Sequence, residues 1–346
     1  MSAQSRKRDR TATVSTVRGA RTRRGAMTRA LLAGAMTAAL AVGCTGTHGT
    51  RDDGRGGDRE SGTPSASPDG PPSELRGSVL AVKIDNSRSA RPHTGLGAAD
   101  VVYVEQVEGG LSRLMAVYAT RLPSAVGPVR SAREADLELL RQFRRPVLAF
   151  SGAQGKLLPL IDEAPLTAVT PEKASGTFYR EPGRPAPHNL YLRPGRLLPE
   201  APGGKALTTG FHYGAPPSGG TAETSRTVRY PAARFTFTWS AQRERWLVSM
   251  DGRAAFTTDG GRLAPATVVV QYVKVHRSDF HDFLGNYTPY TETVGSGKAR
   301  VLRDGRAYDV RWERTEAASG TAFTTPDGHR VNFAEGQVWV VYAKAS

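Results

Sequence analysis

Residues 100–120 read DVVYVEQVEGGLSRLMAVYAT and decide the fold. Two β-rich runs, residues 100–108 and 111–120, flank Gly109-Gly110. Val and Tyr favour strands, and a pair of glycines between two such runs is a strong signal for a tight turn. The stretch therefore predicts a β-hairpin.

The charged residues of this hairpin are the first candidates for a functional site. A two-residue turn would set Gln106 opposite Arg113, so that Glu108 and Arg113 lie on one face and Glu105 on the other. A glycine bulge in the turn would change this parity, so the assignment depends on the turn length. These groups could bind a ligand at a cleft edge or form a cross-strand ion pair.

The segments around the hairpin alternate between strand and helix signals. Strands are expected at residues 79–84 and 146–150, and helices at 132–143 and 156–163. The S-x-x-E pattern of Ser131 and Glu134 predicts a capping box at the start of the first helix. Residues 77–210 are therefore expected to form a mixed α/β domain.

Residues 211–346 have a different composition and predict mainly strands. The expected strands are residues 234–239, 245–250, 267–276, 299–303, 307–312 and 337–343, with Asp-Gly turns at 251, 304 and 327. We expect an α+β fold overall, with a β-rich C-terminal domain following the N-terminal mixed domain.

The N-terminal residues predict export and lipid attachment. A basic stretch precedes the apolar run ALLAGAMTAALAVG (residues 30–43), which has the length of a signal-peptide core, and Cys44 follows directly. We expect residues 1–43 to be a signal peptide, starting at Met1 or Met27, and Cys44 to be acylated, for example with palmitate. Residues 44–76 are rich in Gly, Pro, Ser and charge, and predict a flexible tether. The body would then lie at the outer face of the cytoplasmic membrane, in the bacterial cell envelope.

The net charge of +15 lies largely in the predicted signal peptide. Residues 1–43 contain nine Lys or Arg and one Asp, so the mature chain keeps +7. This distribution predicts no nucleic-acid partner and suits an anionic envelope. Because Cys44 is the only cysteine, its acylation would exclude both a disulfide and a thiol nucleophile.

Two arginines near the start of a predicted helix form the sharpest candidate. The segment GPVRSAR (residues 127–133) places Arg130 and Arg133 around Ser131, where a helix start disfavours cations unless an anion or carboxylate is present. The partner could be a phosphate or carboxylate ligand, or an internal carboxylate such as Asp85, Glu105 or Glu108.

His188 and Asn189, in the loop PHNLY, are the third candidate. His188 could be a general base or a metal ligand, although a lone loop histidine is more often neither. No metal is expected, because nothing in the spacing of the carboxylates and His188 requires one. No cofactor motif occurs in the chain.

Several motifs together resemble the YerB-like lipoprotein family. They include AVKIDN (81–86), Arg91-Pro92, ADVVY (99–103), VEGG (107–110), GPVRSAR (127–133) and PHNLY (187–191), and later VVVQ (268–271) and GQVW (336–339). The resemblance covers residues 78–343. It implies a bacterial lipoprotein with a mixed N-terminal domain, a β-rich C-terminal domain and a function that is not established.

These observations lead to one main hypothesis and two alternatives. The main hypothesis is an envelope protein that binds an anionic wall polymer or lipid-linked precursor. The expected ligand-binding residues are Asp85, Arg91, Glu105, Glu108, Arg113, Arg130, Ser131, Arg133, His188 and Asn189. One alternative is a hydrolase or transferase acting on wall glycan or phosphate, with Glu105 or Glu108 as acid/base and His188 assisting. The other is an adaptor that binds another protein.

Overall fold

The computed structural model describes residues 75, 77–282 and 285–346. The predicted signal peptide, Cys44 and nearly all of the predicted tether lie outside these residues. Among the described residues, no helix is long and apolar enough to cross a membrane.

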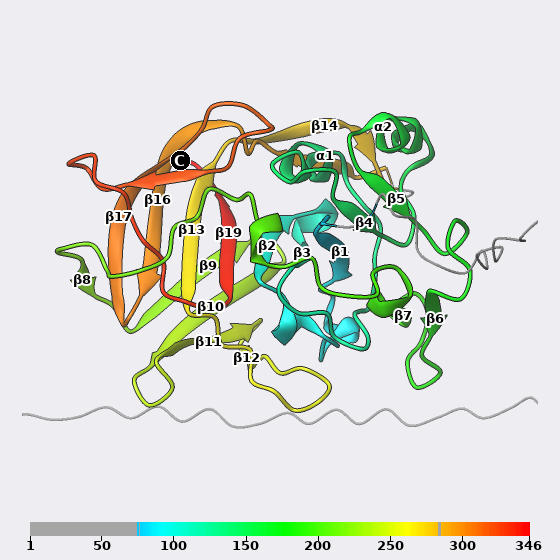
Figure 1. Cartoon of the computed structure of the whole chain (residues 1–346), viewed down its shortest axis with the longest axis horizontal. Helices are drawn as coiled ribbons and strands as arrows, with labels where there is room; N and C mark the ends of the chain where they lie inside the picture. Colours follow the sequence, from blue (N-terminus) through cyan, green and yellow to red (C-terminus); the bar gives the residue numbers. More distant parts are fainter. Residues whose placement is uncertain (1–74, 76, 283–284) are drawn as a thin grey trace, which may run out of the picture. The chain divides into compact units, whose positions relative to one another are not determined.

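One large mixed sheet joins the two halves of the sequence (Figure 1). Its strand order is β18-β17-β16-β13-β19-β2-β3-β1-β4-β5, with β8 paired to β17. The bounds are β1 Leu80–Asp85, β2 Val101–Gln106, β3 Ser112–Tyr118, β4 Val147–Ala149, β5 Thr167–Val169, β8 Thr221–Ala222, β13 Thr267–Val273, β16 Gly295–Arg303, β17 Arg306–Arg314, β18 Ala322–Thr324 and β19 Val338–Lys344.

Strand β19 connects the halves, because it pairs in parallel with β13 on one side and with β2 on the other. Its residues are buried from Val338 to Tyr342, as expected for a strand whose two faces are both covered. The apolar run of this segment therefore reflects a central position in the sheet.

A smaller antiparallel sheet covers one face of the large sheet. It contains β9 Ser225–Tyr230, β10 Ala233–Ser240, β11 Arg245–Met250 and β12 Arg253–Ala254. Alternate residues of β10 point inward, so that Phe235 and Phe237 pack against Trp339 at ring-centroid distances of 6.4 and 6.0 Å. This face forms one hydrophobic core.

The opposite face packs against the helices. These are α1 Glu134–Leu140 and α2 Leu158–Glu163, and Leu139, Leu140 and Ile161 enter a second core with Tyr103 and Met115. Two further pairs of strands stand apart from these sheets: β6 Phe178–Arg180 with β7 Leu190–Leu192, and β14 Val275–His281 with β15 Tyr287–Thr291.

The expected α+β class is too helical. Within the described residues the protein is mostly β, with α-helices of seven and six residues. The predicted helix 132–143 is shortened at its start because residues 130–132 make sheet-like bonds: the amide of Ala132 donates to Gly152 O at 3.0 Å, and that of Ser151 to Arg130 O at 3.0 Å. The expected strand 267–276 is divided between β13 and β14, which belong to different sheets.

The predicted capping box is also displaced by two residues. The N-cap of α1 is Arg133, not Ser131, and its amide donates to the Asp136 carboxylate at 2.7 Å. Asp136 therefore takes the role expected for Glu134.

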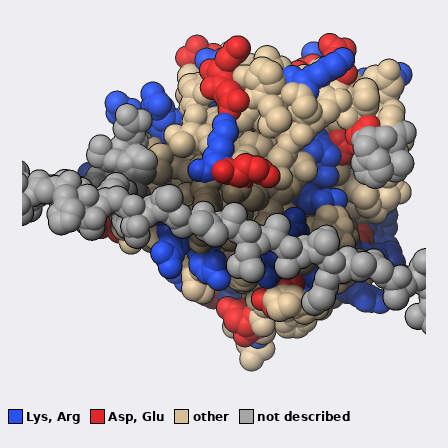
Figure 2. Space-filling model, turned by 90° about the vertical axis from the view of Figure 1, so that its right-hand side faces the viewer, with Lys and Arg blue, Asp and Glu red and all other residues tan. Residues whose placement is uncertain are grey.

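The surface carries charges of both signs. Figure 2 shows the face at the right of Figure 1, where acidic side chains are interspersed among Lys and Arg.

Candidate functional site

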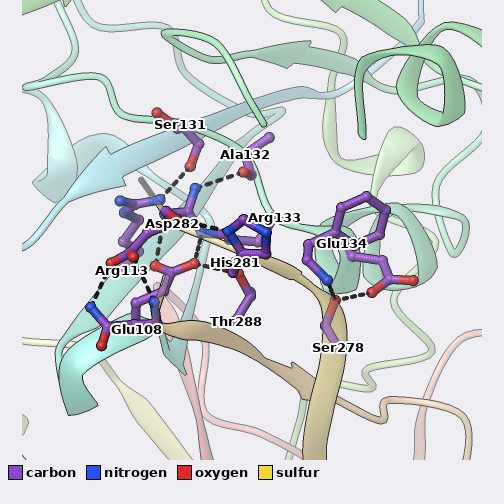
Figure 3. Close-up of polar contacts among 12 residues, drawn as sticks. Glu108, Arg113, Ser131, Ala132, Arg133, Glu134, Ser278, His281, Asp282 and Thr288 are labelled. Carbon is purple, nitrogen blue, oxygen red and sulfur yellow. Dashed lines mark hydrogen bonds and ion pairs between the residues drawn. The ribbon is translucent and has the colours of Figure 1, made fainter. Parts of the chain in front are cut away.

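A pocket of about 650 Å³ opens beside the ends of β1 and β2 and beneath the β14–β15 pair. Seven of the predicted site residues line it: Asp85, Glu108, Arg113, Arg130, Ser131, Arg133 and His188. The β14–β15 pair contributes Phe280, His281, Asp282 and Thr288 to the same pocket (Figure 3). The site thus combines residues from both halves of the chain.

The segment 127–133 reaches the pocket because it runs beside β1. The amide of Asp85 donates to Pro128 O at 2.9 Å, and the amide of Arg130 donates to Lys83 O at 2.8 Å. This pairing satisfies the end of β1, whose beginning pairs with β4. It also places the side chains of Asp85 and Arg130 next to each other.

The hairpin turn is longer than the predicted two residues. Glu105 faces Arg113 and Gln106 faces Ser112 in the register, and Glu108–Gly110 form a three-residue turn, η4. Gly109 and Gly110 have φ of 65° and 71°, a conformation that glycine adopts at little cost. The expected parity was therefore wrong, because Glu105 and Arg113 share a face.

Glu108 and Arg133 form a bidentate ion pair (Figure 3). Arg133 Nε donates to Glu108 Oε1 at 2.6 Å, and Nη2 donates to Oε2 at 2.7 Å. Thr288 also donates to Glu108. Burial alone would raise the pKa of Glu108, but the hydrogen bonds and charge of Arg133 bring this pKa below its ordinary value. Arg133 therefore pairs with an internal carboxylate. This was one of the two partners predicted for it, the other being a ligand.

Asp85 is the centre of a second cluster. Its Oδ1 accepts a hydrogen bond from the Ser87 amide at 3.0 Å, and its Oδ2 lies 2.7 Å from His188 Nδ1 and 3.4 Å from Arg130 Nε. Burial opposes ionisation, yet these contacts lower the pKa of Asp85 below its ordinary value. The carboxylate is therefore ionised at neutral pH.

Arg113 differs from the other two arginines of the pocket. Its Nη1 donates to Ser131 O at 2.8 Å, and it forms no ion pair with any described residue. Burial, followed by repulsion from Arg133, lowers the pKa of Arg113 to about 9. Arg113 is partly buried, and the charges around it are Arg133 and Arg130 as well as the carboxylates Glu108 and Asp85. Because both carboxylates already pair with other groups, the guanidinium of Arg113 can still bind an anion.

Three predicted site residues lie outside the pocket lining: Arg91 and Asn189, which hold neighbouring segments, and Glu105, which is buried below the pocket. Arg91 donates to Asn86 and, at 2.8 Å, to Asp251 Oδ2, and so ties β1 to the β11–β12 turn. Asn189 accepts a hydrogen bond from Arg180 at 2.8 Å and so holds the loop that carries His188. Arg91 and Asn189 therefore hold segments next to the pocket and do not line it.

Glu105 belongs to a buried charge cluster under the pocket. It contacts Lys83 Nζ, which also donates to Asp136 Oδ1 at 2.6 Å. Burial lowers the pKa of Lys83 to about 8, although Asp136 opposes the shift. The prediction missed Lys83 and Asp136, but a lysine in the apolar run LAVKID was a usable signal, because a buried lysine requires a carboxylate partner.

The pocket residues from β14 and β15 were also missed. Phe280, His281, Asp282 and Thr288 carry no motif, and their approach to the pocket depends on the path of the C-terminal half. The contact to α1 fixes that path: Ser278 donates to Glu134 at 2.5 Å, and Thr293 donates to Glu138 through its amide and its hydroxyl. In the described part of the chain, no group of three His, Cys, Asp or Glu is arranged to hold a metal ion.

Family models match both halves of the chain in order. The model described as "Protein of unknown function (DUF3048) N-terminal domain" matches residues 66–206, and that for the DUF3048 C-terminal domain matches residues 226–340. The chain belongs to the DUF3048 family. Its two-domain order agrees with the sequence prediction, and the boundary between residues 210 and 211 stays a prediction.

A relative and a solved structure support this membership. The chain is 24% identical over 277 residues to "Putative lipoprotein YerB" of Bacillus subtilis (strain 168), covering 75% of this chain and 80% of that protein. The crystal structure of YerB has the same fold, with a TM-score of 0.63 and 20% identity over 78% of this chain and 91% of that chain. The resemblance read from the motifs is therefore confirmed.

Proposed function

We propose that this protein is a lipid-anchored envelope protein whose pocket binds an anionic ligand, either a wall polymer or a lipid-linked precursor. The name of the B. subtilis relative and the sequence around Cys44 support the anchor. Replacing Cys44 with Ser should release the protein from the membrane fraction and abolish palmitate labelling. An unchanged membrane fraction would contradict the anchor.

The arginine that lacks an ion-pair partner carries the proposal for the ligand. Within the described residues, neither Nε nor Nη2 of Arg113 donates a hydrogen bond, and neither Nη group of Arg130 does. Guanidinium groups with unused donors on a pocket wall suit a phosphate or carboxylate.

The carboxylates of the pocket leave these donors of Arg113 and Arg130 available to a ligand, because each carboxylate already accepts hydrogen bonds from other groups of the protein. Glu108 and Asp85 have the partners described above, Glu134 accepts from Ser278, and Asp282 accepts from Asn286 at 2.8 Å. Gln154 adds a buried Oε1 without a partner among the described residues, which could accept from a ligand hydroxyl. An anionic group on a sugar or glycerol fits this set.

The acid/base alternative built on Glu105 or Glu108 has little support in the geometry. Glu105 is held by Lys83 outside the pocket lining, and Glu108 is committed to Arg133. Both carboxylates would have to leave an ion pair before they could accept a proton from a substrate.

Thermal shift and calorimetry of the full-length chain with inorganic phosphate, glycerol 3-phosphate and N-acetylmuramic acid test the proposal. A ligand that binds only the native state raises the unfolding temperature. Since a hydrogen bond to a charged group contributes about 1.5–3 kcal/mol, Arg113→Gln should weaken binding about 10- to 100-fold. Arg311→Gln, an exposed site on β17, is the matched control.

Two results would contradict anion binding. One is the absence of stabilisation by any of the three probes. The other is equal stabilisation of Arg113→Gln and the wild type.

A further inference from the structure

The environment of His188 leaves one ring nitrogen unused. Nδ1 lies 2.7 Å from Asp85 Oδ2 and 3.1 Å from Ser87 Oγ, whereas Nε2 has no hydrogen-bond partner among the described residues. The ring is about one-fifth exposed and lines the pocket. The side chain is therefore fixed at one nitrogen and available at the other.

The charge of Asp85 decides the tautomer. An ionised carboxylate can only accept a hydrogen bond, so Nδ1 of the neutral imidazole must carry the proton and Nε2 must carry the lone pair. A carboxylate that orients a histidine in this way is the arrangement of a general base.

The same geometry excludes Ser87 as a nucleophile activated by His188. A serine is activated by the nitrogen opposite the one that the carboxylate holds, but Ser87 and Asp85 meet the same Nδ1. The proton acceptor at Nε2 thus faces a molecule that enters the pocket from solvent, which is water or a substrate hydroxyl.

The loop around His188 is well anchored for this role. Asn189 is held by Arg180, and the two Nη groups of Arg184 donate to Ala90 O and Pro92 O at 2.8 and 2.7 Å. These bonds tie the loop to the segment that follows β1. The imidazole and Asp85 are consequently held in place before any ligand arrives, as a general base requires.

We propose that His188 is the general base of a phosphoester hydrolase site in this pocket, with Asp85 as its positioning residue and Arg113 and Arg130 as the groups that hold the phosphoryl oxygens. The inference rests on the anion-binding function proposed above and adds a reaction to it. Several guanidinium groups suit a phosphoryl group because its charge is spread over several oxygens.

The reaction needs only water as a second reactant. The water oxygen forms a bond to phosphorus while the bond from phosphorus to the ester oxygen breaks, and Nε2 of His188 accepts the proton that the water loses. The imidazolium then returns this proton to the leaving alkoxide. The products are an alcohol and a phosphate or phosphate monoester, and His188 is neutral again.

Release of 4-nitrophenol from bis(4-nitrophenyl) phosphate and from 4-nitrophenyl phosphate by the full-length chain tests this inference. Because general bases contribute about 10²- to 10⁴-fold, His188→Asn should lower kcat/KM by that factor. Phosphate binding should persist, since the arginines remain. His276→Asn, an exposed histidine of β14 outside the pocket lining, should leave turnover unchanged.

Asp85→Asn separates positioning from a structural effect. It should lower kcat without raising KM, because losing a negative charge beside Arg130 does not weaken the binding of an anion. A rise in KM with unchanged kcat would mean that Asp85 only shapes the pocket, and would contradict its assigned role.

The outcomes separate this inference from the proposed function. Arg113-dependent binding of phosphate with no turnover of either ester would overturn the hydrolase and leave the binding function in place. Turnover that survives in His188→Asn would also overturn it. Failure of phosphate and of glycerol 3-phosphate to bind would overturn the hydrolase, and failure of all three probes would remove both proposals.

Discussion

At the scale of single residues, carboxylates organise the site. Asp85 joins β1, the His188 loop and the segment around Arg130, and Glu108 joins the hairpin turn to Arg133 and Thr288. Each carboxylate connects segments that are far apart in the sequence. The pairs therefore contribute to the stability of the native state as well as to the pocket.

The lowered pKa of Glu108 predicts a pH-dependent contribution to stability. Because the folded pKa lies below the ordinary value of 4.5, the unfolded chain binds more protons near this pH. The stabilisation is complete above about 4.5 and is lost as the pH falls through the folded pKa. Glu108→Gln should reduce the free energy of unfolding by about 3 kcal/mol at pH 7, since it leaves Arg133 unpaired. The difference from wild type should narrow below pH 4.5.

Urea unfolding at a series of pH values measures this effect. Glu313→Gln, at an exposed position of β17, is the control and should follow the wild type. A Glu108→Gln deficit that stays constant down to pH 3 would show that the ion pair is not its source.

Individual residues also show how far the sequence could predict the site. Seven predicted residues line one pocket, partly because residues 127–133 run beside the end of β1. The sequence alone could not indicate whether these residues meet in an open pocket. Their role in binding stays a prediction. The positions of Glu105 and Arg91 could not be predicted, because their partners Lys83 and Asp251 are set by register and by a contact between distant turns.

At the scale of elements, the turn η4 places the hairpin against the C-terminal half. Gly110 O accepts a hydrogen bond from the Ala232 amide at 2.9 Å. A Cβ on Gly110 would lie 2.5 Å from Pro231 Cβ, whereas a Cβ on Gly109 would meet nothing within 4 Å. The two glycines share a positive φ and differ in their surroundings.

This difference predicts unequal effects of two matched substitutions. Gly109→Ala should cost about 1 kcal/mol, the penalty for an alanine in the left-handed region. Gly110→Ala should cost about 1–3 kcal/mol more, because the added methyl group overlaps Pro231. Urea unfolding of both variants measures this difference. An equal decrease in the free energy of unfolding would mean that Pro231 moves aside without an energetic penalty.

The turn also explains why the hairpin was only partly predictable. Both strands were expected at their observed positions, since alternating β-branched and aromatic residues are a strong local signal. The turn length was not determined, because Gly-Gly is compatible with two-residue and three-residue turns. A change of one residue in the turn moved Glu105 to the face of Arg113.

At the scale of the whole molecule, the two family domains share one sheet. The β19–β2 pairing crosses between them, and Tyr230 OH, in the C-terminal half, donates to Val104 O of β2 at 3.3 Å. Changes in composition along the chain indicated two domains. They could not indicate that a strand of the second domain pairs with a strand of the first. Parallel pairing between distant segments leaves no local sequence signal.

The shared sheet predicts a single cooperative unfolding unit. Amide hydrogen exchange should give the same opening free energy for β2–β3 and for β13–β16, because separating the domains would expose two unpaired strand edges. The β14–β15 pair, which lies outside the large sheet, should exchange at lower free energy. A lower opening free energy for β2–β3 than for β13–β16 would indicate that the domains unfold separately.

The central position of β19 also has a consequence for the order of events during synthesis. Strand β2 emerges long before residues 338–344, so one of its edges has no native partner until most of the chain has been made. An unpaired edge is a template for association with other chains. Chaperones that shield this edge would therefore raise the yield of folded protein, and the large sheet would be complete only after β19 has joined it.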